Sequence, residues 1–178
     1  MKLSKKNKII KTKDLHFFIE QKECEFITVV DLGYNDGSFE KSISKIFNNY
    51  TLYCVDANKQ FSSISDNSHF DNFLMSNQSF KKEKFYLNPN NSGASSKIFV
   101  FDEKNYSLVQ AITLKDYYNY RNIDKVDILK IDIEGAEYDA LLNDSFLEFY
   151  EVKKLFIEVD LNPRDNRFSL EQLLKYLE

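Results

Sequence analysis

Cysteine and histidine are scarce in this chain of 178 residues. The sequence has two cysteines, Cys24 and Cys54, and two histidines, His16 and His69. Two cysteines do not form the disulfide framework of a small secreted protein, and they are typical of a reducing cytoplasm. The histidines stand far apart and show no metal-ligand spacing. We therefore predict a cytoplasmic protein with neither a disulfide framework nor a histidine-bound metal.

Long apolar runs are also missing, so the sequence predicts no membrane span. Residues 1–13 contain six lysines and no acidic residue, and they lack the apolar core of a secretory signal. We predict a basic, solvated arm over residues 1–13 and one domain over residues 14–178. Subtracting those six lysines from the 24 basic residues leaves 18, against 28 acidic residues. This acidic excess argues against a nucleic-acid partner.

Glycine is rare as well, with four in the chain: Gly33, Gly37, Gly93 and Gly135. Each one follows or joins a strand-like run. In so glycine-poor a chain, we expect them where the backbone must bend sharply or approach a ligand closely. Gly33 and Gly37 lie in the most informative stretch, residues 27–40, which reads as a strand, a glycine-containing turn and a helix. Asn35 and Asp36 in this turn are candidate caps of the helix.

The hydrophobic pattern alternates between strands and helices, which predicts an α/β fold: a three-layer, doubly wound and mostly parallel sheet. The principal strands are predicted at 25–32, 51–55, 72–76, 126–133 and 154–160. Additional strands are predicted at 84–87, 96–101 and 108–113. Helices are predicted at 13–22, 37–48 and 58–66, from about 114 to 121, from 134, and from Ser169 onward.

Carboxylates end four of the principal strands. The carboxyl ends of parallel strands meet at one edge, so these acids should line one rim of the sheet. Uncompensated acids repel one another, which indicates a cationic or diol-rich ligand. Asp56, at the end of the second strand, is placed to bind both hydroxyls of a ribose. The rim residues are Asp31, Asp56, Asp132, Glu134, Glu158 and Asp160.

Two nucleoside ligands compete for this rim. A nicotinamide dinucleotide favours the loop G-x-G-x-x-G, whereas this loop reads G-x-x-x-G and lacks the third glycine. S-adenosylmethionine has no phosphate and carries a sulfonium and an ammonium, so it suits an acidic rim better. An NAD-dependent oxidoreductase remains the less favoured alternative, and a non-catalytic nucleoside-binding domain that acts through a partner chain is another.

Several segments resemble a known family in the same order and spacing, over roughly residues 25 to 160. Residues 31–38, DLGYNDGS, look like the D-x-G-x-N-x-G motif of class I methyltransferases. Residues 123–137, IDKVDILKIDIEGAE, are very similar to the hallmark segment of the FkbM family. Further blocks that resemble the family are NSGASS at 91–96, ITLKDY at 112–117 and FIEVD at 156–160. The resemblance implies a Rossmann-like fold and S-adenosylmethionine-dependent methylation, usually of a hydroxyl on a sugar, glycan or natural product.

Each candidate residue then has an expected role. Asp31, Gly33, Asn35 and Gly37 would hold the methionine end of S-adenosylmethionine, Asp56 the ribose, and Ser76 and Asn77 would flank the adenine. Asp132, Glu134 and Glu158 are the candidates for the base and for positioning the acceptor, which requires a carboxyl whose pKa is raised by burial or by its neighbours. Glu134 and Glu137 alternatively stabilise a helix N-terminus. A divalent cation held by Asp132 and Asp160 is a minor alternative.

Two features depart from the family pattern. The second strand usually ends in Glu-Pro, and here it ends in Asp56-Ala57, which preserves the charge. The class usually adds two strands after the fifth, and nothing here supplies them, so we expect missing C-terminal strands and a truncated domain. Strand 153–160 would then be an exposed apolar edge, and we expect the chain either to form a homo-oligomer through it or to be an incomplete domain of marginal stability. The other expected partner is a small-molecule or glycan acceptor.

Overall fold

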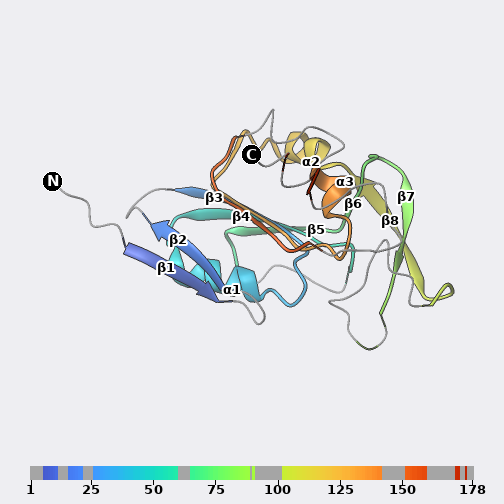
Figure 1. Cartoon of the computed structure of the whole chain (residues 1–178), viewed down its shortest axis with the longest axis horizontal. Helices are drawn as coiled ribbons and strands as arrows, with labels where there is room; N and C mark the ends of the chain where they lie inside the picture. The colour runs from blue at the N-terminus through green and yellow to red at the C-terminus, as the bar shows by residue number, and fades with distance from the viewer. Residues whose placement is uncertain are drawn as a thin grey trace.

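The centre of the molecule is a parallel sheet of five strands (Figure 1). The structure is a computed structural model that describes residues 6–11, 16–21, 26–59, 65–88, 90, 102–141, 151–159, 171–172 and 175. In spatial order the strands are β12 (Leu155–Ile157), β10 (Ile128–Ile131), β3 (Ile27–Leu32), β4 (Tyr50–Val55) and β5 (Ser68–Asp71). This sheet confirms the predicted α/β class.

Helices cover both faces of the sheet, which explains why the central strands are apolar on both sides. Helix α1 (Ser38–Ile46) lies on one face, while α2 (Leu114–Arg121) and α3 (Glu137–Leu141) lie on the other (Figure 1). On the α1 face, Phe39 and Ile43 of the helix pack against Val29 and Leu52 of the sheet. The fold therefore has the three layers predicted from the sequence.

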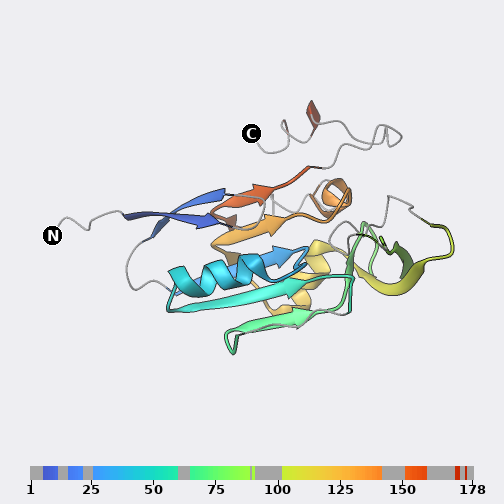
Figure 2. The ribbon, with the colours of Figure 1, turned by 90° about the horizontal axis from the view of Figure 1, so that it is seen from below.

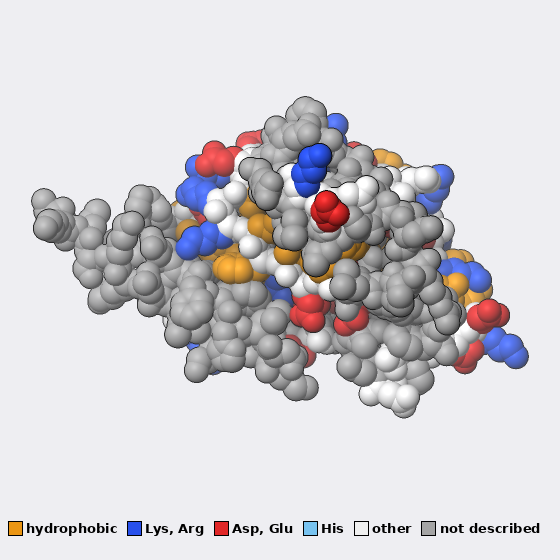
Figure 3. Space-filling model, in the orientation of Figure 1, with side chains coloured by type: hydrophobic (Ala, Val, Ile, Leu, Met, Phe, Trp, Pro, Cys, Tyr) orange, Lys and Arg blue, Asp and Glu red, His pale blue; other side chains and the backbone are white. Residues whose placement is uncertain are grey.

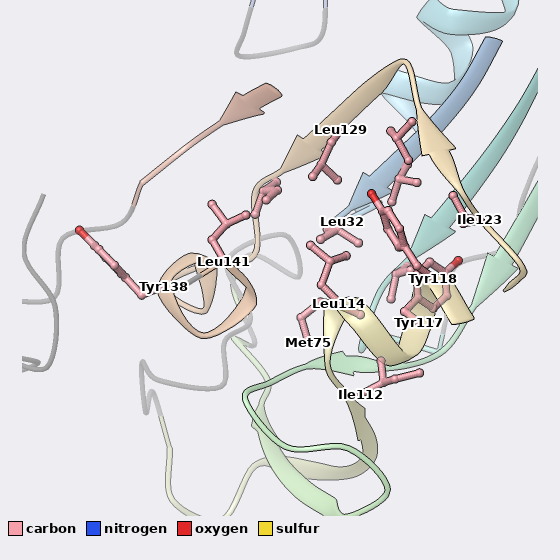
Figure 4. Packing of buried hydrophobic residues seen from close by; sticks show 14 residues of the cluster. Leu32, Met75, Ile112, Leu114, Tyr117, Tyr118, Ile123, Leu129, Tyr138 and Leu141 are labelled. Atoms are coloured by element: carbon pink, nitrogen blue, oxygen red, sulfur yellow. The ribbon is translucent and has the colours of Figure 1, made fainter. Parts of the chain in front are cut away.

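The opposite face holds the larger core. Tyr117 and Tyr118 of α2 are completely buried there, and Leu114 of the same helix packs with them against Leu32 and Leu129 of the sheet (Figure 4). Burying a large aromatic side chain removes about 150–250 Å² from water. These two tyrosines therefore make α2 a main support of the sheet.

A second, three-stranded sheet lies beyond the carboxyl ends of the central strands (Figures 1 and 2). It contains β6 (Leu74–Met75), β8 (Tyr106–Ile112) and β7 (Lys82–Tyr86), in that order. Leu74, Phe85 and Val109 form its small core, against which Ala57 packs. Hydrophobic, basic and acidic side chains appear together on this end of the molecule (Figure 3). The second sheet thus stands close to the loop that follows β4.

The strand order creates a switch point between β3 and β10. From β3 the chain proceeds through β4 to β5 on one side, and it later returns to place β10 on the other side of β3. In open α/β sheets, ligands bind outside the carboxyl ends of the strands at such a point. The loops that follow β3 and β10 are therefore the first place to look for a site.

One predicted element near the N-terminus is wrong. Residues 13–22 were expected to be helical, but His16–Gln21 form strand β2, which pairs antiparallel with β1 (Lys6–Lys11). Within the predicted basic arm, residues 6–11 form β1, which contacts α1. The segment HFFIEQ is rich in aromatic and β-branched residues, which favour strands. Its pairing partner lies in a lysine-rich segment that has no clear strand pattern of its own.

Two further expectations need correction, and a third lies mostly outside the described residues. The strand beside β4 is Ser68–Asp71 and not 72–76, of which Leu74–Met75 pair with β8 instead. The single strand predicted at 126–133 is divided into β9 (Lys125–Val126) and β10, and β9 pairs with β11 (Glu151–Val152). The division falls at Asp127, whose Oδ2 accepts a hydrogen bond from the Thr28 backbone N–H at 2.9 Å. The described ends of the expected helix 58–66 are turn or irregular backbone.

The remaining elements agree with the prediction or lie outside the description. The strands predicted at 25–32, 51–55, 84–87, 108–113 and 154–160 and the helices near 37–48, 114–121 and 134 are confirmed within a few residues. Cys54 is buried in β4, as expected. The strand expected at 96–101, Gly93 and Ser169 lie outside the described residues. No helix in the described part of the chain is long and apolar enough to cross a membrane.

Candidate active site

The loops after β3 and β10 touch each other through their backbones. Gly33 has a φ of +86°, and a Cβ atom placed on it would lie 1.7 Å from the carbonyl oxygen of Asp132. The Asp132 N–H donates to the carbonyl of Leu32 at 3.0 Å. No side chain larger than hydrogen fits at Gly33 without moving backbone, so this glycine sets the distance between the two loops.

The rest of the β3–α1 loop is held by its own short contacts. Asn35 and Gly37 both have positive φ, at 49° and 71°. The Gly37 N–H donates to the Tyr34 carbonyl at 3.1 Å, and the Tyr34 hydroxyl donates to the buried carboxylate of Glu40 at 2.5 Å. Asp36 Oδ1 accepts from the Ser38 N–H at 2.9 Å. The N-cap of α1 is Gly37, which has no side chain to bind the helix, so neither Asn35 nor Asp36 is the N-cap that was predicted. The loop is therefore a fixed turn whose backbone lies at the switch point.

Asp56 joins this loop to the end of β4. Its Oδ2 accepts from the Asn35 N–H at 2.9 Å, and its Oδ1 accepts from the Asn58 N–H at 2.7 Å. Burial raises the pKa of Asp56, and these two backbone donors oppose the rise. The carboxylate lies at the tip of β4, where the ribose-binding acid was predicted, and it retains lone pairs for a further donor.

Asp31 lies beneath the rim, where it pairs with a lysine. Its side chain is completely buried, and Oδ1 lies 3.0 Å from the Nζ atom of Lys130 on β10. Burial raises the pKa of Asp31 to about 6, although the Lys130 ammonium acts in the opposite direction. Burial alone would lower the pKa of Lys130, but the charges of Asp31 and Asp132 outweigh it and raise that pKa. Asp31 therefore contacts Lys130 in this structure, and its contact with a cofactor stays a prediction.

Lys130 corrects the expectation of an uncompensated acidic rim. Its ammonium also donates to the Gly33 carbonyl at 2.8 Å and lies 3.4 Å from Asp132 Oδ2. Sequence reasoning missed this residue, although one signal was present. A lysine inside the apolar run of a strand covered on both faces must have a buried partner, because an unpaired charge there is very costly.

The two residues predicted near the adenine occupy different environments. Ser76 is completely buried, and its hydroxyl donates to Glu83 Oε1 at 2.8 Å within the second sheet. Its N–H donates to the Ile112 carbonyl at 3.0 Å. Asn77 follows it and is partly exposed. Of these two side chains, only that of Asn77 reaches solvent at this end of the sheet.

The three candidate catalytic acids follow neighbouring strands. Asp132 and Glu134 come after β10 and are partly exposed, whereas Glu158 comes after β12 and is exposed. Glu134 has a φ of 54°, a left-handed conformation uncommon for a residue other than glycine. Glu137 Oε1 accepts from the N–H groups of Ile133 and Gly135, both at 3.1 Å. The alternative structural role thus applies to Glu137, which stabilises the turn containing Glu134.

A second buried network was not predicted. Asp71, at the end of β5, accepts a hydrogen bond from the Tyr117 hydroxyl at 2.8 Å and from Arg121 Nε at 2.7 Å, and Arg121 Nη2 binds its other oxygen. Burial, followed by the Asp71 charge, raises the pKa of Tyr117. This network joins the edge of the sheet to α2, so its role is to hold the fold. The described residues contain no group of three or more side chains that could bind a metal ion, and Asp160 lies outside them.

Comparison with known proteins identifies the family of this chain. The family model described as the methyltransferase FkbM domain matches residues 19–178, which is most of the chain. No curated protein and no solved structure matches this chain. The matched region includes the glycine loop after β3, Asp56 after β4 and the Lys130–Glu137 segment. The chain belongs to the FkbM family of methyltransferases, which implies that it uses S-adenosylmethionine.

Proposed function

We propose that this protein transfers a methyl group from S-adenosylmethionine to a hydroxyl group of a sugar, glycan or natural product. The observation that carries this proposal is the meeting of three functional loops at the switch point. The glycine loop touches the backbone of Asp132, and Asn35 of the same loop binds the carboxylate of Asp56. One ligand placed against the glycine loop would therefore lie between Asp56 and Asp132.

The charges of these groups fit S-adenosylmethionine. The Lys130 ammonium forms ion pairs with Asp31 and Asp132, and its charge also acts on Asp56, so these four groups retain an excess of negative charge when all are ionised. Within the described part of the chain, the buried Oδ2 of Asp31 has no hydrogen-bond partner. S-adenosylmethionine carries a sulfonium and an ammonium, whereas the pyrophosphate of NAD would be repelled by the same carboxylates.

The cofactor-binding residues follow from this arrangement. The backbone of Gly33, Asn35 and Gly37 would hold the methionine end, with Asp31 beneath it. Asp56 would accept hydrogen bonds from the ribose hydroxyls. Ser76 and Asn77 would flank the adenine. The Ser76 hydroxyl and N–H already bind Glu83 and the Ile112 carbonyl, so Ser76 would contribute packing and neither of these donors.

The acceptor would lie on the side of β10 and β12. When bound, S-adenosylmethionine supplies an electrophilic methyl group. Asp132, Glu134 and Glu158 would orient the acceptor hydroxyl and take its proton, since alignment and proton removal are the main requirements of this displacement. The partly exposed position of Asp132, beside the glycine loop, makes it the first candidate for the base.

Calorimetric titration with S-adenosylmethionine and with NAD distinguishes the cofactors. Asp56→Ala should weaken S-adenosylmethionine binding by about 1.5–3 kcal/mol, the scale for hydrogen bonds to a charged group. Asp102→Ala is a matched control, because Asp102 Oδ1 accepts from the N–H two residues later, as Asp56 Oδ1 does, but in a distant turn. Unchanged affinity in Asp56→Ala would remove Asp56 from the cofactor site.

A screen of glycans and small hydroxyl compounds with methyl-labelled S-adenosylmethionine then tests catalysis. Transfer to a hydroxyl supports the proposed O-methylation. Binding of S-adenosylmethionine without transfer to any acceptor would favour the alternative of a non-catalytic domain that acts through a partner chain. Transfer to nitrogen or carbon would retain the methyltransferase and contradict the proposed acceptor chemistry.

A further inference from the structure

One buried ammonium connects the two halves of the site. Lys130 Nζ lies 3.0 Å from Asp31 Oδ1, 2.8 Å from the Gly33 carbonyl oxygen and 3.4 Å from Asp132 Oδ2. A lysine ammonium has three protons and no acceptor, so it can direct one proton to each of three oxygens. Two of these oxygens belong to the β3 segment that leads into the glycine loop, and the third belongs to the loop after β10.

Lys130 is buried between the sheet and α1. The parallel register places Lys130 directly beside Asp31 on the α1 face of the sheet. Its side chain is 7% exposed, and the ammonium lies 5.9 Å from the centre of the Phe39 ring of α1. A lysine at the surface would move freely with its charge in water. Here the ammonium is fixed under the helix and so can fix the groups that it binds.

We propose that Lys130 is a positioning residue of the cofactor site, which holds the Gly33 carbonyl and thereby the backbone of residues 33–37. The inference rests on the proposed function and adds a residue to its site. The Asp31 contact places the ammonium, the Gly33 contact fixes the loop, and the Asp132 contact ties the loop to the acceptor side. Small displacements of binding groups are costly in such sites, with an error of about 1 Å worth roughly a hundredfold in rate.

The competing explanation is that Lys130 only balances the charge of Asp31. The two explanations differ in what happens when both charges are removed together. If Lys130 serves only Asp31, then a variant lacking both charges regains stability and binds the cofactor as well as Asp31→Asn alone. If Lys130 positions the loop, the double variant regains stability, because no buried charge is left unpaired, but its loop lacks the tie to Gly33.

The experiment compares Lys130→Met, Asp31→Asn and the double variant with the full wild-type chain. Calorimetric titration with S-adenosylmethionine measures affinity in each folded protein, and urea unfolding measures stability. We expect the double variant to unfold at a higher urea concentration than Lys130→Met and to bind S-adenosylmethionine at least tenfold more weakly than Asp31→Asn. Hydrogen exchange of the Gly33 and Gly37 amides, which bond to the Val55 and Tyr34 carbonyls, should become about tenfold faster in it.

Lys153→Met is the matched control. Lys153 forms an ion pair with Asp127, which precedes β10, and its side chain is 43% exposed. This variant also replaces a paired lysine by methionine, at the amino end of the same strands, and it should leave cofactor affinity and loop exchange unchanged.

The outcomes separate the two proposals. Equal affinity and equal loop exchange in the double variant and in Asp31→Asn would overturn the positioning role and leave the proposed function intact. A double variant that does not fold would also overturn it, because Lys130 would then be required for folding itself. If Lys130→Met alone does not fold, the double variant carries the test. A wild-type chain that does not bind S-adenosylmethionine would overturn the proposed function and this inference together.

Discussion

Replacing Gly33 by alanine tests the contact on which the whole site depends. The new Cβ would lie 1.7 Å from the Asp132 carbonyl oxygen and 2.8 Å from its carbon, both backbone atoms. A flexible side chain could rotate away from the new Cβ, but backbone atoms cannot. The loop after β3 or the end of β10 would therefore have to move. The Lys130 ammonium, which binds the Gly33 carbonyl, resists that movement.

The size of the effect follows from two terms. Holding a residue other than glycine at a φ of +86° costs about 1–3 kcal/mol. Forcing an extra carbon into a packed region typically costs a further 1–3 kcal/mol. The two terms add, so we expect Gly33→Ala to lower the free energy of unfolding by about 2–6 kcal/mol. This is a large fraction of the usual stability of a domain, about 5–15 kcal/mol.

Urea unfolding of the two glycine variants provides the assay and its control. Gly37 also has a positive φ, of +71°, but a Cβ there would approach the hydroxyl end of the Tyr34 side chain at 2.6 Å. Because that side chain can shift, Gly37→Ala should cost less, about 1–3 kcal/mol. A loss below 1 kcal/mol in Gly33→Ala, or a larger loss in Gly37→Ala, would refute the reasoning.

Four further predictions concern charge, stability, catalysis and assembly. The folded pKa of Asp31, about 6, exceeds its ordinary value of 3.8, so folding favours its protonated form. Relative to Asp31→Asn, the wild-type free energy of unfolding should therefore fall by up to ~3 kcal/mol between pH 4 and pH 7, at about 1.4 kcal/mol per pH unit. If the difference in free energy of unfolding between wild type and Asp31→Asn, measured with urea, does not change over this pH range, the prediction is wrong. Arg121→Met should lower the free energy of unfolding by roughly 2–4 kcal/mol, because it leaves the Asp71 carboxylate, which is 7% exposed, without its cation. The loss is somewhat below that for a fully buried pair because Arg121 itself is 25% exposed. The exposed pair Lys125–Glu151 is its control, and Lys125→Met should change stability by less than about 1 kcal/mol. Asp132→Asn should keep cofactor affinity in titration and lower turnover about a hundredfold in the labelled-methyl assay, and full activity would move the base to Glu158. Strand β12 lies at one edge of the five-stranded sheet as described, so we propose that residues 153–160 pair with a second copy. Light scattering over a concentration series should then show a dimer, and a monomer throughout would refute this.

The parts of the fold that the sequence predicted are those with strong local signals. The strand before Gly33 and the helix after it combine an apolar run, two glycines and an amphipathic stripe, and the structure places them within a few residues of the prediction. The tyrosine-rich helix α2 is similar, with Thr113 accepting from the Asp116 N–H as its N-cap. Local chemistry defines these elements, so a reading of the sequence alone finds them.

The missed features depend on contacts between distant residues. Strand β5, SHFD, is short and polar, and it becomes a strand because β4 pairs with it and because Asp71 binds Arg121 from α2. The register of β10 against β3, which puts Lys130 beside Asp31, likewise has no local signal. A single lysine in an apolar strand indicates a buried partner, but only the pairing of the two strands identifies it.

The position of Lys130 changes what the acidic rim is expected to bind. Counted along the sequence, the strand ends carry only acids and predict a strongly cationic ligand. In the fold, Asp31 lies below the surface with its ammonium partner, whereas Asp56, Asp132, Glu134 and Glu158 are closer to solvent. The net attraction for a cation is therefore smaller than the count of acids implies, and a ligand with a modest positive charge and two hydroxyl groups suits the site. S-adenosylmethionine has both properties, so the buried lysine is consistent with the cofactor that the family implies. The Lys130 ammonium thus has two roles. It reduces the negative charge of the carboxylates, and it binds the Gly33 carbonyl of the glycine loop.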